Sequence, residues 1–300
     1  MNAGRAPTVL IGLGATKAGS SWLYERLAAH PECHFRTIKE LQYFPTAISG
    51  KWDREIASYM EAHKALAERL ARKFGKHDPK IPGGEDLRSD KLRRLHDRAE
   101  WIALLEKRRY DPEGYISYLT RHAGAARVVG DITPAYSLLS EEWLERILRL
   151  SGDVKMIYVV RDPLDRLWSH VRMIAARRDP SGKATIERAH NILRRTLRGK
   201  EDQIAIRSDY STILPKLVSV VPHEKLRIET FEDVVTGRAF PEICQFLGIS
   251  SVPVDTAPVY ASQQVSLSAE ARALALEWLR PQYDAALAHF GVLPETWNTP

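Results

Sequence analysis

The sequence predicts an α/β fold, a parallel sheet flanked by helices, with a helical insertion. Short apolar runs alternate with helical patterns along most of the chain, which is typical of a parallel sheet covered on both faces. The clearest run, VKMIYVV at residues 154–160, has the length and composition of a buried strand. Residues 50–125 instead show long amphipathic helical patterns. With 300 residues, the chain suits a single domain, 1–300, that carries this insertion.

The first half of the chain opens with a strand and a helix. Val9–Leu13 is apolar and closed by glycine, which favours a buried strand, and Ser20–His30 is helical until Pro31 ends it. The insertion follows, with helical patterns at 51–75, 92–109 and 113–122 and a charged, Pro- and Gly-rich loop at 76–90.

From Arg127 the alternation returns. RVVG predicts a strand, and the strand at 154–160 leads into a helix with Asp162 as N-cap and Pro163 at its first position. The remaining expected elements are helices at 141–150, 185–198 and 209–221, a strand in KLRIETFEDV, a short helix ending at Gly248, and a terminal helical region, Ser268–Phe290, interrupted by Pro281.

The overall charge is mildly basic. Lys and Arg total 44 against 38 acidic residues, a net charge of +6 that fits an anionic ligand, nucleic acid, an acidic polymer or an ordinary soluble protein. Two cysteines provide neither a disulfide framework nor a zinc cluster, which favours a reducing compartment. The apolar run after Arg5 is too short for a signal core, and no run is long enough to span a membrane. We therefore expect a cytoplasmic protein.

The stretch VLIGLGATKAGSSW (9–22) has the layout of a phosphate-binding loop. A strand enters a turn containing Gly14 and Gly19, and a helix follows, so backbone N–H groups and the helix dipole can face an anion. Ser20 stands where an ATP-binding loop has lysine, and the glycine spacing does not fit a dinucleotide-binding fingerprint. The structural alternative is a tight turn in which Lys17 and the serines are incidental.

TKAGSSWL resembles the 5′-phosphosulfate loop of the sulfotransferases, usually written P-K-x-G-T-T-W-L, with Thr16 in place of proline. The resemblance implies a P-loop-like fold. It also implies that Lys17 contacts the phosphosulfate bridge of 3′-phosphoadenosine-5′-phosphosulfate (PAPS). The residues it places around the 5′ end are Lys17, Ala18, Gly19, Ser20, Ser21 and Trp22.

A second segment, YVVRDPLDRLWSHV, resembles the family's 3′-phosphate segment. Arg161 ends a strand and Ser169 lies two turns into the next helix, so both can reach one phosphate at the carboxyl edge of the sheet. The alternative is that Arg161 pairs with Asp162 or Asp165 and Ser169 faces solvent. Tyr210 matches a family tyrosine near the adenine, although a core tyrosine is equally consistent with the pattern.

Further matches extend the resemblance over most of the chain: GDITPAYS, RIETFEDV and ICQFLGI. Residues 50–125 carry no segment that resembles a named motif of the family, so acceptor specificity is expected to differ there. The resemblance implies an O-sulfotransferase that moves the sulfuryl group from PAPS, its co-substrate, to a hydroxyl of a sugar or small-molecule alcohol. No metal is expected, because lysine and backbone donors can neutralise the transferring group.

The general base implied by the resemblance is Glu40, in TIKELQYF, with Tyr43 and Phe44 as the wall of the acceptor site. The alternative is an exposed Lys39–Glu40 pair. Asp131 is a weaker second acid, expected to hold a substrate hydroxyl or a lysine. The histidines that rank below Glu40 as base are His30, His34 and His170.

Two departures from the family pattern concern the ligand sites. Ile132 stands where many relatives carry lysine before T-P-A-Y, so contacts of that lysine to an acidic sugar are expected to be absent. Only VYASQQVSLS occurs where relatives place a basic, Gly-rich loop. Either Gln263, Gln264 or Arg272 serves the 3′-phosphate, or the site is more open.

Two other functions fit parts of the sequence. A nucleoside or sugar kinase with an altered phosphate loop would need magnesium and an acidic ligand after a strand, but the best strand ends in Arg161. A non-catalytic nucleotide- or nucleic-acid-binding module would use basic residues such as Lys91, Arg93 and Arg94, which alternate with acids as on a solvated helix face. We expect no nucleic-acid partner, and the sequence indicates no oligomeric state.

Overall fold

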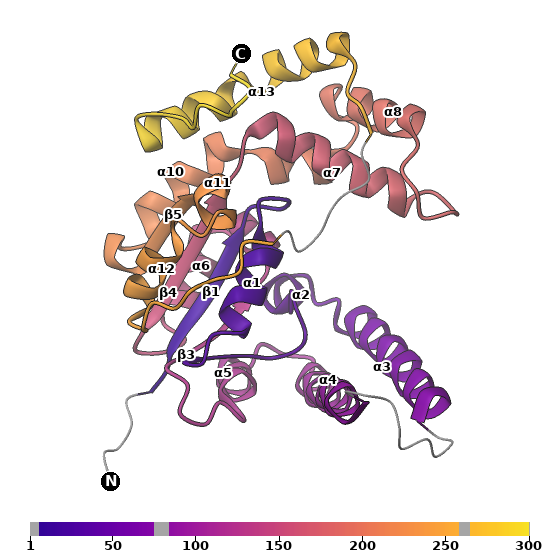
Figure 1. Ribbon diagram of the computed structural model, residues 1–300, viewed down its shortest axis with the longest axis vertical. Helices are drawn as coiled ribbons and strands as arrows, with labels where there is room; N and C mark the ends of the chain where they lie inside the picture. Colours follow the sequence, from indigo (N-terminus) through magenta and orange to yellow (C-terminus); the bar gives the residue numbers. More distant parts are fainter. Residues whose placement is uncertain (1–5, 75–83, 258–264, 300) are drawn as a thin grey trace.

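The computed structural model describes residues 6–74, 84–257 and 265–299 and contains a five-stranded parallel sheet covered by helices (Figure 1). The strand order is β2-β3-β1-β4-β5. The strands are β1 (Thr8–Gly14), β2 (Cys33–Phe35), β3 (Val128–Ile132), β4 (Val154–Val160) and β5 (Leu226–Thr230). Every neighbouring pair runs parallel, so the predicted fold class is confirmed.

The two central strands, β1 and β4, are the most buried part of the sheet. All seven residues of β1 are buried, and β4 is buried except at Lys155. Val9 lies opposite Val129 of β3 and Val154 of β4. From β1 the chain goes to the β3–β2 side, and from β4 it goes to β5. The carboxyl ends of β1 and β4 therefore form the point at which the strand order reverses, where such sheets bind ligands.

One strand of the sheet is not predicted from the sequence. β2 has three residues and pairs with β3, Cys33 opposite Val128 and Phe35 opposite Gly130. A segment this short shows no measurable periodicity, and its strand conformation depends on pairing with a distant part of the chain.

Helices cover both faces of the sheet and form the insertion. They are α1 (Ser20–Ala28), α2 (Tyr43–Ser49), α3 (Trp52–Phe74), α4 (Gly84–Leu105), α5 (Pro112–Thr120), α6 (Glu141–Leu148), α7 (Pro163–Arg177), α8 (Ile186–Leu197), α9 (Asp202–Ala205), α10 (Tyr210–Val220), α11 (Phe231–Val235), α12 (Phe240–Leu247) and α13 (Ala269–Phe290), with 3-10 turns η1 (Pro134–Leu138), η2 (Ile206–Ser208) and η3 (His223–Lys225). Figure 1 shows α7, α8 and α13 at the upper end of the molecule and α3, α4 and α5 at the lower end. Among the described residues, no helix combines the length and apolar composition needed to cross a lipid bilayer.

The insertion is helical as predicted, but its loop is shorter. α4 begins at Gly84, so residues 84–90 of the expected loop at 76–90 are helical, while 75–83 lie outside the described residues. Between Gly84 and Leu105 the sequence contains no proline and no further glycine, which permits one continuous helix. The sequence pattern therefore predicts a Pro- and Gly-rich loop that extends too far toward the C-terminus. Helix α4 also ends earlier than expected, at Leu105 instead of Arg109.

The expected interruption at Pro281 is wrong, because α13 continues through that residue. A proline inside a helix leaves the carbonyl four residues earlier, here that of Glu277, without its donor. Both residues are exposed, so water can satisfy this carbonyl and the helix is preserved.

Candidate active site

The phosphate-loop segment lies between β1 and α1, at the point where the strand order reverses. Gly19 precedes α1 with φ 87°, and a Cβ at this position would lie 3.0 Å from the Phe231 ring, so both conformation and space require glycine. α1 has no side-chain cap, and no hydrogen bond between described residues uses the N–H of Gly19, Ser20 or Ser21. These N–H groups at a helix N-terminus are suited to an anion.

Lys17 adds positive charge to this loop. Burial lowers the pKa of Lys17, and the charges of Arg161, Lys39, Arg177 and Arg172 lower it further. A half-buried amine surrounded by cations is electrostatically unfavourable by itself, and a bound anion would offset the repulsion.

Arg161 connects the end of β4 to the loop after β1. Its Nη1 donates to the Lys17 carbonyl at 3.2 Å, and its guanidinium lies 4.4 Å from the centre of the Phe231 ring. The alternative prediction is that Arg161 pairs with an acidic residue. It is partly correct, because the Arg161 guanidinium lies 3.6 Å from the Asp165 carboxylate. Asp162 instead caps α7, as predicted, by accepting from the Asp165 N–H at 2.8 Å. The Nε of Arg161 is buried with no hydrogen-bond partner among the described residues, which leaves a donor for a ligand.

Tyr210 lies behind Arg161. Its ring is fully buried, and its hydroxyl accepts from the Arg161 N–H and donates to the Arg161 carbonyl, both at 3.1 Å. This placement fits the core alternative for Tyr210 and not a direct contact with adenine. The tyrosine fixes the backbone from which the Arg161 side chain extends.

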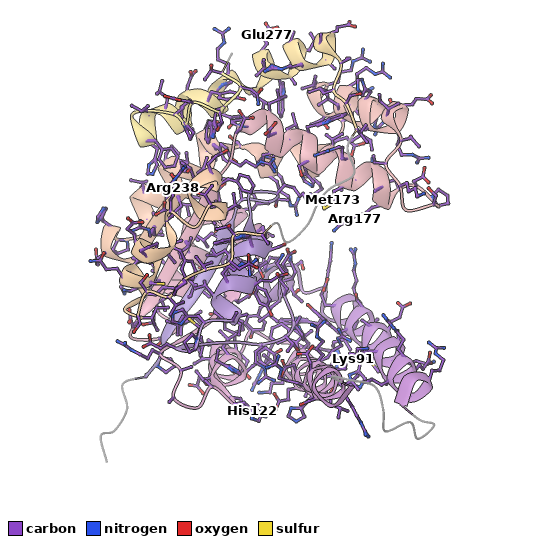
Figure 2. All side chains as sticks on the ribbon, viewed as in Figure 1. Lys91, His122, Met173, Arg177, Arg238 and Glu277 are labelled. Atoms are coloured by element: carbon purple, nitrogen blue, oxygen red, sulfur yellow. The ribbon has the colours of Figure 1, made fainter. Side chains whose placement is uncertain are left out.

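Helix α7 contributes further polar residues near Arg161 and Lys17. Ser169 is 5% exposed and lies on the helix that begins just after Arg161. Burial and the charges of Arg166, Arg207, Lys17 and Arg177 lower the pKa of His170, which lies beside Ser169, to about 3. Figure 2 shows Arg177 on the lower side of α7, turned toward the part of the molecule that contains α1 and α3.

Glu40 lies close to the phosphate loop. It follows β2 in a left-handed conformation, φ 61°, and its side chain is 41% exposed. The Lys39 ammonium lies 3.4 Å from the Glu40 carboxylate and donates a hydrogen bond to the Ser21 hydroxyl. Lys39 therefore links the candidate base to the first turn of α1. The predicted alternative, a Lys39–Glu40 pair, is present, but it is attached to the candidate phosphate site.

Sequence reasoning missed several cations of this cluster, among them Arg172, Arg177 and Arg207. Burial lowers the pKa of Arg207, and the opposing charge that acts on it is that of Glu40. Arg207 also donates to the Gln203 carbonyl at 2.8 Å. The sequence signal for Arg177 was the recurrence of polar residues every three or four positions along α7. Arg207 lies in a 3-10 turn and had no such signal.

The predicted acceptor wall is located in the core. Tyr43 and Phe44 are fully buried at the start of α2. Tyr43 stacks on Tyr115 with ring centres 4.7 Å apart, and its hydroxyl donates to the Asp111 carbonyl at 2.9 Å. As placed, neither side chain reaches a surface that an acceptor could contact. The aromatic pair instead anchors the segment that carries Glu40.

Asp131 is likewise part of the core. The side chain is 3% exposed, and its carboxylate accepts hydrogen bonds from Tyr115 at 3.0 Å, from Tyr136 and from Thr133 at 2.8 Å. Burial raises the pKa of Asp131 against the effect of these donors. The carboxylate also accepts from the N–H of Leu41, so Asp131 supports the Glu40 turn from behind instead of meeting a substrate.

The rival histidines differ in their surroundings. His30 is buried; its Nε2 lies 2.9 Å from the Ser250 carbonyl, and its Nδ1 accepts from the Glu32 N–H. His34 lies on β2, the edge strand, and burial lowers its pKa. His170 is the histidine that lies among the phosphate-site cations.

The structure describes Ile132 and Arg272, two of the residues at which the sequence departs from the family pattern. Ile132 is buried against β1, where a Cβ on Gly12 would lie 2.7 Å from its side chain, so Ile132 fills the sheet surface. Gln263 and Gln264 lie outside the described residues. Arg272 donates to Asn298 at 2.6 Å, and the Asn298 amide lies 3.5 Å from Asp165, which also contacts Arg161.

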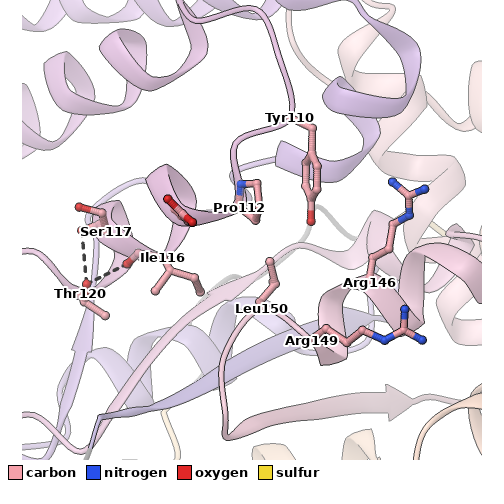
Figure 3. Close-up of a pocket in the computed structure, with 9 residues that line it drawn as sticks. Tyr110, Pro112, Ile116, Ser117, Thr120, Arg146, Arg149 and Leu150 are labelled. Atoms are coloured by element: carbon pink, nitrogen blue, oxygen red, sulfur yellow. Dashed lines mark hydrogen bonds between the residues drawn. The ribbon is translucent and has the colours of Figure 1, made fainter.

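A surface groove of about 780 Å³ lies elsewhere, between α5 and α6 (Figure 3). Its lining includes Tyr110, Pro112, Ile116, Arg146 and Leu150. None of the predicted site residues lines it. The predicted site residues gather instead near the carboxyl ends of β1 and β4, where sheets of this kind bind ligands.

Comparison with known proteins identifies the fold and the family. The chain is similar to a sulfotransferase from Alicyclobacillus acidocaldarius, with a TM-score of 0.62 and 16% identity over 98% of this chain and 99% of that one. It is also similar to the sulfotransferase domain of the Synechococcus PCC 7002 olefin synthase, with a TM-score of 0.53 and 18% identity over 97% of each chain. A third similar structure is the sulfotransferase domain from the curacin biosynthetic pathway, with a TM-score of 0.54 and 18% identity over 99% of this chain and 100% of that one.

At this identity the three structures show a shared fold. No curated protein sequence matches the chain. The model of the sulfotransferase family matches residues 7–252, which include the phosphate loop, Glu40 and Arg161. The chain belongs to the sulfotransferase family.

Proposed function

We propose that this protein is a PAPS-dependent O-sulfotransferase that acts as one domain with its acceptor side at α3–α5. The observation that carries the proposal is a cluster of cations around an uncapped helix N-terminus. Lys17 is held among Arg161, Lys39, Arg172 and Arg177, next to N–H groups at the start of α1 that have no hydrogen-bond partner among the described residues. A phosphosulfate is an anion that this arrangement would stabilise.

The 5′ end of the donor would bind at the start of α1. The N–H groups of Gly19, Ser20 and Ser21 would hold the 5′-phosphate, and Lys17 would neutralise charge on the sulfuryl group as it leaves. Ser21 already accepts a hydrogen bond from Lys39, so a second cation is available close to the bridge.

The 3′-phosphate would bind Arg161 and Ser169. The buried Nε of Arg161 has no partner among the described residues, and a phosphate oxygen would satisfy it. Arg272 would take part of the role of the basic loop that the sequence lacks, because it reaches Asp165 through Asn298. Tyr210 would act by holding Arg161 in place.

Glu40 would act as general base. It would take the proton of an acceptor hydroxyl while the hydroxyl oxygen forms a bond to sulfur and the bond from sulfur to the 5′-phosphate oxygen breaks. The products would be a sulfate ester and adenosine 3′,5′-bisphosphate. Lys39 keeps Glu40 beside the loop that would hold the sulfuryl group.

The acceptor class we favour is a sugar or small-molecule alcohol. Two similar structures are sulfotransferase domains of an olefin synthase and of the curacin pathway, so natural-product alcohols belong in the first set to be tested. Both cysteines, Cys33 and Cys244, are unpaired thiols, which supports action in a reducing compartment such as the cytoplasm.

The experiment that tests this function follows labelled sulfate from PAPS to a panel of sugars and alcohols, with a metal chelator present. Sulfate-ester formation under these conditions supports the proposal. Transfer from ATP that requires magnesium, with none from PAPS, would support the kinase alternative instead.

The base assignment is tested by comparing Glu40→Gln with His170→Gln. We expect Glu40→Gln to lower kcat by about 10²- to 10⁴-fold, the usual contribution of a general base. It should leave the affinity for adenosine 3′,5′-bisphosphate nearly unchanged. Because burial and nearby cations lower the pKa of His170 to about 3, we expect the His170 variant to retain more activity. The opposite order would move the base to His170.

A further inference from the structure

Three side chains with metal-binding atoms meet far from the phosphate loop. His96 and Glu100 lie one turn apart on α4, and His122 follows α5. One ligand atom from each lies within 4.8 Å of the others. The His122 Nε2 is 3.4 Å from the Glu100 carboxylate, and the His96 Nδ1 is 4.0 Å from it. Figure 2 shows His122 at the lower end of the molecule, away from Arg177.

These separations suit a small divalent ion. Ligands that lie about 2.0–2.1 Å from a tetrahedral zinc ion are about 3.4 Å from one another. Two imidazoles and one carboxylate form a recognised ligand set for zinc, with a fourth position left for water. His96 and His122 have side chains that are 61% and 55% exposed, so small rotations can close the remaining distance.

The surroundings fix the carboxylate and leave room for an ion. The side chain of Glu100 is 14% exposed, and one of its oxygens is held by Arg36, which also pairs with Asp97 at 2.9 Å. Such an outer partner orients a metal ligand. A groove of about 520 Å³ beside it is lined by His96 and His122.

One cation, Arg121, competes with a metal ion for the Glu100 carboxylate. Arg121 donates at 3.1 Å to the Glu100 oxygen that Arg36 does not hold, the same oxygen that faces the two histidines. Its side chain is 54% exposed, so it can turn into solvent when an ion binds. A divalent ion bound by three ligands gains more from this oxygen than a single exposed ion pair does.

We propose that His96, Glu100 and His122 form a binding site for a divalent cation of the zinc class. The ion would tie α4 of the insertion to the segment after α5. The sequence predicts no metal for the reaction, and none of the three ligands belongs to the proposed donor site or is the proposed base. His96 and Glu100 have the i, i+4 spacing of helical metal ligands, but His122 is brought to them only by the fold.

The test measures zinc binding to the full-length chain without an affinity tag, by calorimetry and by equilibrium dialysis. Cobalt serves as a second probe, because its visible absorption reports a tetrahedral site. The variants are His96→Gln and His122→Gln, and the matched control is His223→Gln, which removes another exposed imidazole in η3. The Tm of each variant in a chelator shows that it is folded.

We expect one equivalent of zinc in the parent and in His223→Gln. Affinity should fall by about 100-fold in His96→Gln and in His122→Gln, since even loss of an outer-shell partner costs 10- to 100-fold. Zinc should raise the Tm of the parent and not that of His122→Gln. Absence of stoichiometric binding, or equal binding by all four proteins, would overturn the proposal. Sulfuryl transfer in chelator is independent of either result.

Discussion

Two clusters of charged side chains in this molecule differ in how their charge is balanced. Arg36, in the segment after β2, has a side chain that is 1% exposed and pairs with Asp97 and Glu100. Lys17, at the loop after β1, is acted on by other cations, and its pKa is lowered by burial and by Arg161 and Lys39. Removing Arg36 would leave buried carboxylates without their partner, whereas the cations beside the uncapped helix N-terminus are suited to an incoming anion.

The largest effect on stability should come from the balanced group. Arg36→Ala leaves the carboxylates of Asp97 and Glu100 without their buried partner, and we expect it to lower the free energy of unfolding by about 3–5 kcal/mol. Denaturant unfolding measures this loss. A loss below about 1 kcal/mol would mean that the pair behaves like one on the surface.

Lys17→Ala should show the opposite behaviour. We expect sulfuryl transfer to fall by about 10²- to 10³-fold, the range for loss of one donor to developing charge. The free energy of unfolding should not fall, because the substitution removes a cation that burial and its neighbours disfavour. If Lys17→Ala unfolds as easily as Arg36→Ala, the distinction between the two groups fails.

The pH dependence of stability provides a smaller effect with a defined sign. The pKa of Lys17 is lowered below 10.5 in the folded chain, so between the folded value and 10.5 the unfolded chain binds more protons. The contribution of Lys17 to stability therefore rises with pH through this window, and its penalty is fully present below the folded pKa. The difference in unfolding free energy between the parent and Lys17→Met, measured from neutral pH upward, should follow this rise. A flat difference would contradict it.

The smallest effect should come from an ordinary surface pair. Arg149, the residue after α6, lies 2.9 Å from Glu145 in the last turn of that helix, and the two side chains are 73% and 51% exposed. We expect Arg149→Ala to change the free energy of unfolding by about 0.3–0.5 kcal/mol and to leave bisphosphate binding unchanged. Denaturant unfolding and calorimetry check both values. A larger change would mean that surface arginines are not neutral references here.

Local sequence patterns predict the helices and strands that carry the site. Contacts between distant parts of the chain determine where the side chains lie. Asp162 was identified as the cap of α7 because its signal is contained in a few neighbouring residues. Tyr43 could not be placed in the core from sequence, because its partners, Tyr115 and the Asp111 carbonyl, come from α5 and the residue before it. Arg207 reaches the charge of Glu40 only through the fold. Charge and aromatic character near a motif do not tell whether a side chain faces a ligand or the core.

The most direct test is a calorimetric titration, without magnesium, of adenosine 3′,5′-bisphosphate against the parent chain, with ADP and AMP as reference ligands. We expect preference for the bisphosphate and a loss of affinity of about 10- to 150-fold in Arg161→Ala, equivalent to about 1.5–3 kcal/mol for hydrogen bonds to a charged group. Arg149→Ala, which removes an exposed arginine, should bind like the parent. Equal affinity for the three nucleotides, or an Arg161→Ala variant that binds like the parent, would contradict the assignment of this cationic cluster to the sulfate donor.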